Sequence, residues 1–284
     1  MPLSETAPAK INLTLRVIGR RSDGYHTLES LVAFADIADE VTLEPGEAAS
    51  LVVEGAFAGP SGPTADNLVM KAADALAAQV GSLRTGRFQL QKNIPVAAGL
   101  GGGSSDAAAA LRLLAVCNGL TLDDPRLLTA ALAIGADVPV CLDPRAKVMR
   151  GVGEQLSPPV AIPKMAAVLI NPGVAAATKD VFAAFDRRYA SSVAIDEIPP
   201  GREPFIEWLA GMHNDLTEAA ATRAPVIRQV LTALSAQIDC RLARMSGSGA
   251  TCFALFDGGD EARYAAERLQ AAHRSWWVRA TTLN

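Results

Sequence analysis

The sequence predicts an α+β fold organised as two domains, and three observations carry this prediction. Apolar and polar residues alternate strictly over residues 9–17, as in a half-buried strand. A glycine-rich stretch at residues 95–106 runs directly into an alanine-rich helix. After residue 160 the chain reads strand, helix, strand, strand, helix and strand once additional helices are set aside. This order of elements is typical of a ferredoxin-like domain.

Length and composition exclude several classes of protein. The 284 residues, 50% of them apolar, allow one large domain or two ordinary ones with a substantial core. The formal net charge is −4 without a basic block, which argues against nucleic acid or an acidic membrane surface as a partner. The sequence shows neither a membrane-spanning apolar run nor a signal peptide, and its four cysteines lack C-x-x-C spacing. We therefore expect a soluble cytoplasmic protein with free thiols.

The stretch at residues 95–106 is the strongest candidate for a binding site. Four glycines fall within residues 99–103, and they open a helix whose first N–H groups are free at the positive end of its dipole. Such an arrangement binds anions, most often phosphate. The stretch lacks the Gly-Lys-Ser/Thr ending of a Walker A loop and the spacing of a Rossmann fingerprint. The alternative is a flexible loop capped by Ser104 or Ser105, although an ordinary cap does not need three consecutive glycines.

The remaining helices and strands are predicted from the spacing of apolar residues and from the positions of glycine and proline. In the first half we expect strands at 27–34, 40–44 and 88–91, and helices at 67–80 capped by Asp66, from the glycine stretch to about 118, and from Asp123 to about 135. The proline-rich run at 157–163 marks a boundary between domains 1–160 and 161–284. In the second half we expect strands at 166–170, 241–245, 251–256 and 276–282, helices at 178–189, 204–236 and 260–272, and a loose stretch at 190–203.

Several residues outside the glycine stretch are candidates for function, each with a structural alternative. Lys10 and Asn12 share one face of the first strand about 7 Å apart, where they either meet a ligand or form a solvated face. Asp137 lies between an apolar helix and an apolar strand-like run, and the pattern alone favours a helix cap over a functional carboxylate. The link at residues 247–249 is either a loop of close approach or a plain hairpin. Residues 21–26 read as a turn of a hairpin on their own.

Three segments together resemble the GHMP kinase superfamily in order and spacing: Ala9-Lys10-Ile11-Asn12-Leu13, the loop from Pro95 to Ser105, and Ser246-Gly247-Ser248-Gly249-Ala250. Four pieces resemble the branch of that superfamily that acts on cytidine-diphosphate-linked methylerythritol: Pro8 to Leu13, Arg21-Ser22-Asp23-Gly24-Tyr25-His26, Gly135-Ala136-Asp137-Val138-Pro139, and Asn171-Pro172-Gly173-Val174 with Thr178. The resemblance implies a ribosomal-S5-domain-2-like N-terminal domain and a ferredoxin-like C-terminal domain. It also implies ATP-dependent phosphorylation of the 2-hydroxyl of that substrate, in the non-mevalonate route to isoprenoid precursors.

The resemblance further implies roles for individual residues. Asp137 takes the proton of the acceptor hydroxyl, and Lys10 holds Asp137 ionised and offsets charge on the transferring group. The implied ATP-binding residues are Pro95, Val96, Ala97, Ala98, Gly99, Leu100, Gly101, Gly102, Gly103, Ser104 and Ser105. The implied substrate-binding residues are Asn12, Tyr25, His26, Thr178, Phe182, Gly247 and Ser248.

Within the implied site, Tyr25 and Phe182 flank the cytosine and His26 reads its polar edge, while an ordinary core position remains the alternative for Phe182. Mg²⁺ accompanies ATP, with ligands that the sequence does not assign. Asp106 either reaches a phosphate-bound Mg²⁺ or points away from it.

Two rival functions remain at this stage. One is a GHMP kinase for a mevalonate-type, sugar or homoserine acceptor, against which the residues around Tyr25 and His26 argue. The other is a catalytically silent protein that senses a nucleotide, against which the presence of both Lys10 and Asp137 argues. The expected partner is a small molecule, and the chain is expected to be a monomer or a homodimer.

Overall fold

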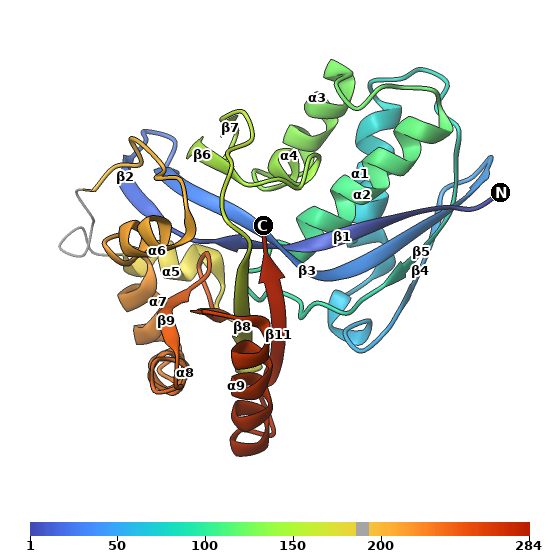
Figure 1. The fold of residues 1–284 in the computed structure, drawn as a ribbon. Coiled ribbons are helices and arrows are strands. Elements are labelled where there is room, and N and C mark those ends of the chain that lie inside the picture. The colour runs from blue at the N-terminus through green and yellow to red at the C-terminus, as the bar shows by residue number, and fades with distance from the viewer. Residues whose placement is uncertain (186–192) are drawn as a thin grey trace. The chain divides into compact units, whose positions relative to one another are not determined.

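A computed structural model describes residues 1–185 and 193–284 of the chain (Figure 1). Internal contacts divide the chain into two compact, interleaved units. The first unit holds Met1–Lys10, Ile37–Val96 and Gly101–Pro144, and the second holds Ile11–Asp36, Ala97–Leu100 and Arg145–Asn284. These units are defined by contacts and differ from the stretches 1–160 and 161–284, so that division of the sequence into domains stays a prediction.

The first unit combines strands with a group of helices. Two long strands, β1 (Leu3–Asn12) and β3 (His26–Gly46), contribute residues to both units. The other elements of the first unit are β4 (Ser50–Glu54), η1 (Gly59–Ser61), η2 (Thr64–Asp66), α1 (Leu68–Ala77), β5 (Thr85–Gln91), α2 (Gly102–Cys117), α3 (Pro125–Ile134) and α4 (Val138–Cys141). Strand β5 pairs antiparallel with the second half of β3 and parallel with β4.

Helix α2 is the centre of the helical group in the first unit. It packs against α1, α3 and α4, and all of its residues from Ser105 to Ala115 are buried. Four consecutive alanines at 107–110 lack bulky side chains, so neighbouring helices approach α2 closely. The expected helix after the glycine stretch is thereby confirmed, and it ends before Gly119, as the sequence predicted.

The helix caps differ by one residue from those expected. Asn67 rather than Asp66 caps α1, accepting a hydrogen bond from Val69 N at 3.0 Å. Likewise Asp124 rather than Asp123 caps α3, and the same carboxylate accepts from Arg126 N at 2.9 Å. Adjacent polar residues offer equivalent caps in the sequence, and the backbone geometry decides between them.

In the second unit, strands β11, β8, β10 and β9 pair antiparallel in this order, and β11 also pairs with β3 at Ala35. Strand β10 lies between β8 and β9, which splits the first β-α-β unit as expected for a ferredoxin-like arrangement. Helix α8 packs on β9 and β10, and α9 packs on β8 and β11. The elements of this unit are β2 (Arg16–Arg20), β6 (Lys147–Gly151), β7 (Gln155–Leu156), β8 (Met165–Asn171), α5 (Thr178–Ala184), α6 (Arg202–Ala210), α7 (Thr217–Arg223), α8 (Val226–Ser235), β9 (Cys240–Met245), β10 (Cys252–Phe256), α9 (Gly259–Ala272) and β11 (Trp277–Leu283).

Several expectations for the second unit are corrected. The expected helix at 178–189 ends at Ala184, and its last four residues lie outside the described part of the chain. The region 204–236 forms helices as expected, namely α6 to α8, although α6 begins earlier, at Arg202. In the expected loose stretch, residues 193–199 have neither helix nor strand, whereas 190–192 lie outside the described residues. Over the described residues, helices reach neither the length nor the apolarity of a membrane span.

The prediction of a half-buried strand at 9–17 is wrong in two respects. The strand breaks after Asn12 and resumes at Arg16, which divides it into β1 and β2. Its polar face is also buried, because Lys10, Asn12 and Thr14 are each at most 5% exposed. Buried polar groups need hydrogen-bond or ion-pair partners, and all three side chains have them. The polar face of this stretch is therefore a row of paired, buried side chains.

Candidate functional site

The glycine loop adopts a conformation that larger residues cannot. Gly99 has φ +75°, and a Cβ there would lie 2.7 Å from the carbonyl oxygens of Ser246 and Gly249. Gly101 has φ +60°, directly precedes α2, and would place a Cβ 3.2 Å from the Lys10 side chain. The loop thus brings bare backbone to the start of α2, where the first N–H groups are free to bind an anion.

Lys10 and Asp137 form an ion pair beside this loop. Lys10 Nζ lies 2.8 Å from Asp137 Oδ2, and the two side chains are 4% and 40% exposed. The ammonium is therefore buried while the carboxylate remains open to solvent. A carboxylate with this access can accept a proton from a bound hydroxyl, and the neighbouring positive charge can offset charge that develops there.

The Asp137 side chain forms an ion pair and does not cap a helix. It occupies the N-cap position of α4, yet within the described chain its side chain makes no capping hydrogen bond and instead pairs with Lys10. The expected strand-like run after Asp137 is wrong, because Val138–Cys141 is a short helix. Pro139 lies in its first turn, where a missing N–H is tolerated.

Helix α2 ties together the two elements that carry this ion pair. Arg112 donates to the carbonyl oxygens of Cys141 at 2.8 Å and Thr6 at 2.7 Å, so it connects α4 with β1. Its Nε also donates to Glu5 at 3.0 Å. Nearer the start of α2, the Ser105 hydroxyl donates to Pro8 O at 2.7 Å. The Ser105 hydroxyl is thus occupied by β1, which leaves Ser104 as the partly exposed hydroxyl in the first turn.

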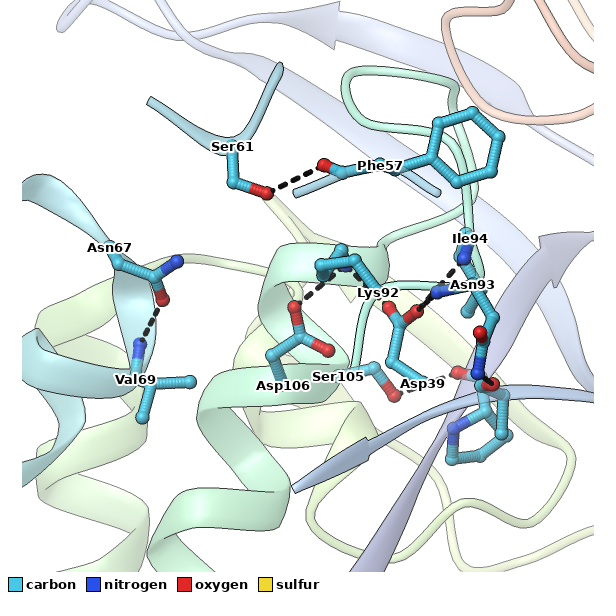
Figure 2. Close-up of polar contacts among 12 residues, drawn as sticks. Asp39, Phe57, Ser61, Asn67, Val69, Lys92, Asn93, Ile94, Ser105 and Asp106 are labelled. Atoms are coloured by element: carbon cyan, nitrogen blue, oxygen red, sulfur yellow. Dashed lines mark hydrogen bonds and ion pairs between the residues drawn. The ribbon is translucent and has the colours of Figure 1, made fainter. Parts of the chain in front are cut away.

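Asp106 points into a buried cluster of charged side chains (Figure 2). Its Oδ2 lies 2.8 Å from Lys92 Nζ, and Lys92 also pairs with Asp39. Asp106 Oδ1 is buried and has no hydrogen-bond partner among the described residues. Burial raises the pKa of Asp106 to about 8, against the lowering effect of Lys92. Although burial opposes the charge on Lys92, the two carboxylates raise its pKa.

Residues expected at the substrate gather in two groups in the second unit. Asn12 donates to Ser30 Oγ at 2.7 Å and lies beside Gly247, where a Cβ would come within 3.3 Å of Asn12 Oδ1. Thr178 and Ser248 share a hydrogen bond of 2.8 Å between their hydroxyls. The close-approach interpretation of residues 247–249 is therefore supported by neighbours from β1 and from the start of α5.

Two of the three aromatic residues expected at the cytosine are in contact with one another. His26 stacks on Phe182 with ring centroids 5.1 Å apart, and Phe185 contacts His26 edge-on at 6.1 Å. Tyr25 is 66% exposed and makes no ring contact with an aromatic residue that the structure describes. Burial, followed by the charge of Arg20, lowers the pKa of His26 and so favours its neutral ring.

Several residues that position the site were missed at the level of sequence. Ser246 Oγ accepts from Asn12 N at 3.1 Å and donates to Gly99 O at 3.0 Å. Asn214 donates to Gly247 O at 2.8 Å and to the carbonyl of Met245. These hydrogen bonds hold the loop at residues 246–250 in place. No local pattern could reveal these residues, because their partners are remote in sequence. Arg112, Lys92 and Asp39 were missed for the same reason.

Comparison with known proteins agrees with this geometry. The model of the GHMP kinases N terminal domain matches residues 67–143, and that of the GHMP kinases C terminal matches residues 202–275. The GHMP kinases are ATP-dependent kinases of small molecules, and this chain is one of them. A solved structure described as 4-(cytidine 5'-diphospho)-2C-methyl-D-erythritol kinase superposes with a TM-score of 0.81 at 35% identity, covering 99% of each chain. A homoserine kinase from Cytophaga hutchinsonii, 18% identical with a TM-score of 0.71, covers 100% of this chain and 95% of its own and shares the fold alone.

Two relatives with curated names narrow the assignment. The 4-diphosphocytidyl-2-C-methyl-D-erythritol kinases of Methylorubrum extorquens and Methylobacterium radiotolerans are 53% and 55% identical to this chain, over 99% of each chain in both comparisons. The chain therefore belongs to the 4-diphosphocytidyl-2-C-methyl-D-erythritol kinase family of GHMP kinases. The fold and family expected from the sequence are confirmed, whereas the roles of individual site residues stay predictions.

The raised pKa of Asp106 predicts a specific dependence of stability on pH. An acid that binds its proton more tightly when folded contributes stability that is complete below its ordinary value of 3.8 and is lost as the pH rises to about 8. Asp106→Asn lacks this titration. Thermal melts should therefore show wild-type stability falling relative to the variant between about pH 5 and pH 8. A difference that stays constant over this range would contradict the prediction.

Arg112 is predicted to matter for turnover as well as for stability. Arg112→Met leaves the buried carbonyl oxygen of Cys141 without its donor, at a cost of about 1–3 kcal/mol, removes the bond to the more accessible Thr6 O, and loosens the elements that carry Lys10 and Asp137. We expect kcat to fall about tenfold and the melting temperature to drop. Glu5→Gln is the matched control, because it keeps both backbone bonds of Arg112. Steady-state kinetics with thermal melts test this, and a lowered melting temperature with unchanged kcat would restrict Arg112 to stability.

Proposed function

We propose that the protein transfers the γ-phosphoryl group of ATP to the 2-hydroxyl of 4-diphosphocytidyl-2-C-methyl-D-erythritol, in the non-mevalonate route to isoprenoid precursors. The names of the full-length relatives support the choice of acceptor. The observation that carries the chemistry is the Lys10–Asp137 pair at 2.8 Å, with its accessible carboxylate. A protein that only sensed a nucleotide would have no use for a proton acceptor placed beside a buried lysine.

In this proposal Asp137 is the proton acceptor of the reaction. As the acceptor oxygen bonds to the γ-phosphorus, the bond from that phosphorus to the oxygen bridging to the β-phosphorus breaks. The hydroxyl proton passes to the Asp137 carboxylate and then to solvent. A carboxylate is a weak base, but it need take the proton only as the new bond forms. Lys10 offsets negative charge on the transferring group, and residues 95–105 bind the phosphates through backbone N–H groups.

Mg²⁺ fits this site as a companion of the ATP phosphates. The described residues contain no group of three metal-ligating side chains, and Mg²⁺ at such sites keeps several waters and uses substrate phosphates as ligands. Ser104 is the candidate protein hydroxyl, because the Ser105 hydroxyl donates to Pro8. Asp106 is not a candidate, since it is buried and paired with Lys92. When bound, Mg²⁺ would neutralise charge on the phosphates.

The cytidine end is assigned to residues of the second unit. Phe182 and Tyr25 offer aromatic faces for the cytosine, where stacking adds about 0.5–1.5 kcal/mol beyond burial. His26 is placed against Phe182 in its favoured neutral form and reads the polar edge of the base. Asn12, Thr178, Gly247 and Ser248 bind the polar groups of the substrate, supported by their grouping around residues 247–249.

We also propose a cellular compartment and an oligomeric state for the protein. All four cysteines are free, as expected of a protein that works in the reducing cytoplasm. The partner is a small molecule, and the chain acts as a monomer or a homodimer.

Turnover with a panel of acceptors tests the proposed function. Purified protein with ATP and Mg²⁺ should release ADP when given 4-diphosphocytidyl-2-C-methyl-D-erythritol, and should not do so with mevalonate, homoserine or galactose. Turnover with one of those controls alone would keep the kinase chemistry and remove the cytidine site. ATP binding without turnover on any acceptor would favour the nucleotide sensor.

The role of Asp137 gives a sharper prediction. Asp137→Asn keeps the shape of the side chain but cannot take a proton, so kcat should fall about 100- to 10,000-fold. The dissociation constant for ADP should stay within about threefold of wild type, because the phosphate loop is unchanged.

The matched control for that variant is Asp124→Asn. Asp124 is also an N-cap aspartate of the first unit, but its side chain caps α3 and asparagine caps equally well. We expect near wild-type kcat for this control. A turnover rate close to wild type in Asp137→Asn would remove Asp137 from the chemistry.

A further inference from the structure

The glycine loop begins and ends on the same buried cluster of charges. At its start, Asp39 Oδ1 on β3 accepts hydrogen bonds from the backbone N–H groups of Asn93 at 2.5 Å and Ile94 at 2.8 Å. At its end, Asp106 in α2 lies 2.8 Å from Lys92 Nζ. Lys92 also pairs with Asp39, so one ammonium group joins both ends (Figure 2).

This cluster is shielded from water. Asp39, Lys92 and Asp106 are 1%, 3% and 2% exposed. Attraction between opposite charges and hydrogen bonds to charged groups are stronger in such surroundings than at the surface, and removing one partner leaves buried polar groups unsatisfied. The cluster is thus a stiff connection, unlike a solvated ion pair of small net effect.

The cluster also lies directly against the first turn of α2. A Cβ on Gly102 would come within 3.5 Å of Lys92 Nζ and 3.7 Å of Asp39 Oδ2. Gly102 is the first residue of α2 and one of the positions whose N–H group is free to meet an anion. The cluster therefore lies next to the backbone that we propose to bind the anion.

We propose that Asp39, Lys92 and Asp106 are positioning residues that hold the glycine loop in its phosphate-binding form by fastening its two ends to β3 and to Lys92, the residue directly after β5. The inference rests on the proposed function of this loop as the ATP phosphate site. A loop held in its bound conformation loses less conformational entropy on binding, so the cluster strengthens nucleotide binding without touching the nucleotide.

The test uses three variants of the full-length protein. Asp106→Ala cuts the tie between Lys92 and α2, while Asp106→Asn keeps an oxygen that can accept from Lys92. Asn118→Ala is the matched control at the opposite end of α2, where Asn118 bonds to the backbone of Arg84 and Leu114. All three are measured for melting temperature, for ADP affinity by calorimetry, and for backbone hydrogen exchange in peptides that cover residues 95–105.

For Asp106→Ala we expect ADP to bind about tenfold more weakly and residues 95–105 to exchange faster. Asp106→Asn should restore both measurements to near wild type. Asn118→Ala should lower the melting temperature and leave both unchanged. If Asp106→Ala lowers only the melting temperature, the cluster serves stability alone and the proposal is overturned.

A second variant covers the case in which Asp106→Ala is unstable. If Asp106→Ala does not fold, Asp39→Asn replaces it, because it retains an oxygen for Asn93 and Ile94 and weakens only the link to Lys92. Faster exchange at 95–105 is again expected, and unchanged exchange would overturn the proposal. If the wild-type protein binds no ADP, the proposed nucleotide site fails, whereas the exchange data still decide whether the cluster holds the loop.

Discussion

The first unit depends on the hydrogen bonds and ion pairs that three buried polar residues of α2 make with their surroundings. Ser105, Asp106 and Arg112 interrupt the buried stretch of α2 at residues 105–115, which is otherwise alanine and leucine. Burying each of them costs free energy unless a partner is present. Their partners lie on β1, on α4 and, in the case of Lys92, directly after β5. The requirement to satisfy these groups therefore fixes α2 relative to the segments that carry Lys10, Asp137 and the start of the glycine loop.

Two lysine–aspartate pairs in this unit have the same length and different surroundings. Lys10–Asp137 and Lys92–Asp106 both measure 2.8 Å, but the carboxylate side chains are 40% and 3% exposed. Only the exposed carboxylate is open to a bound ligand. The buried carboxylate, whose pKa rises to about 8, is a structural connection instead. Access to solvent thus separates the pair suited to chemistry from the pair suited to holding the loop.

Features that depend on residues close together in the chain could be predicted from the sequence. The glycine loop, the helix after it and the split β-α-β order of the second half follow from local spacing and were confirmed. The run after Asp137 was mistaken for a strand, because Pro139 is as compatible with the first turn of a helix as with extended chain. The roles of Lys92 and Arg112 could not be predicted, since their partners are brought together only by the fold. The burial of the polar face of 9–17 was missed for the same reason.

A structure of the protein with a non-hydrolysable ATP analogue, Mg²⁺ and 4-diphosphocytidyl-2-C-methyl-D-erythritol tests the central claim most directly. The account predicts the 2-hydroxyl oxygen within hydrogen-bond distance of the Asp137 carboxylate, with the phosphates on the backbone N–H groups at the start of α2. An acceptor oxygen remote from Asp137, or phosphates bound away from residues 99–105, would contradict it.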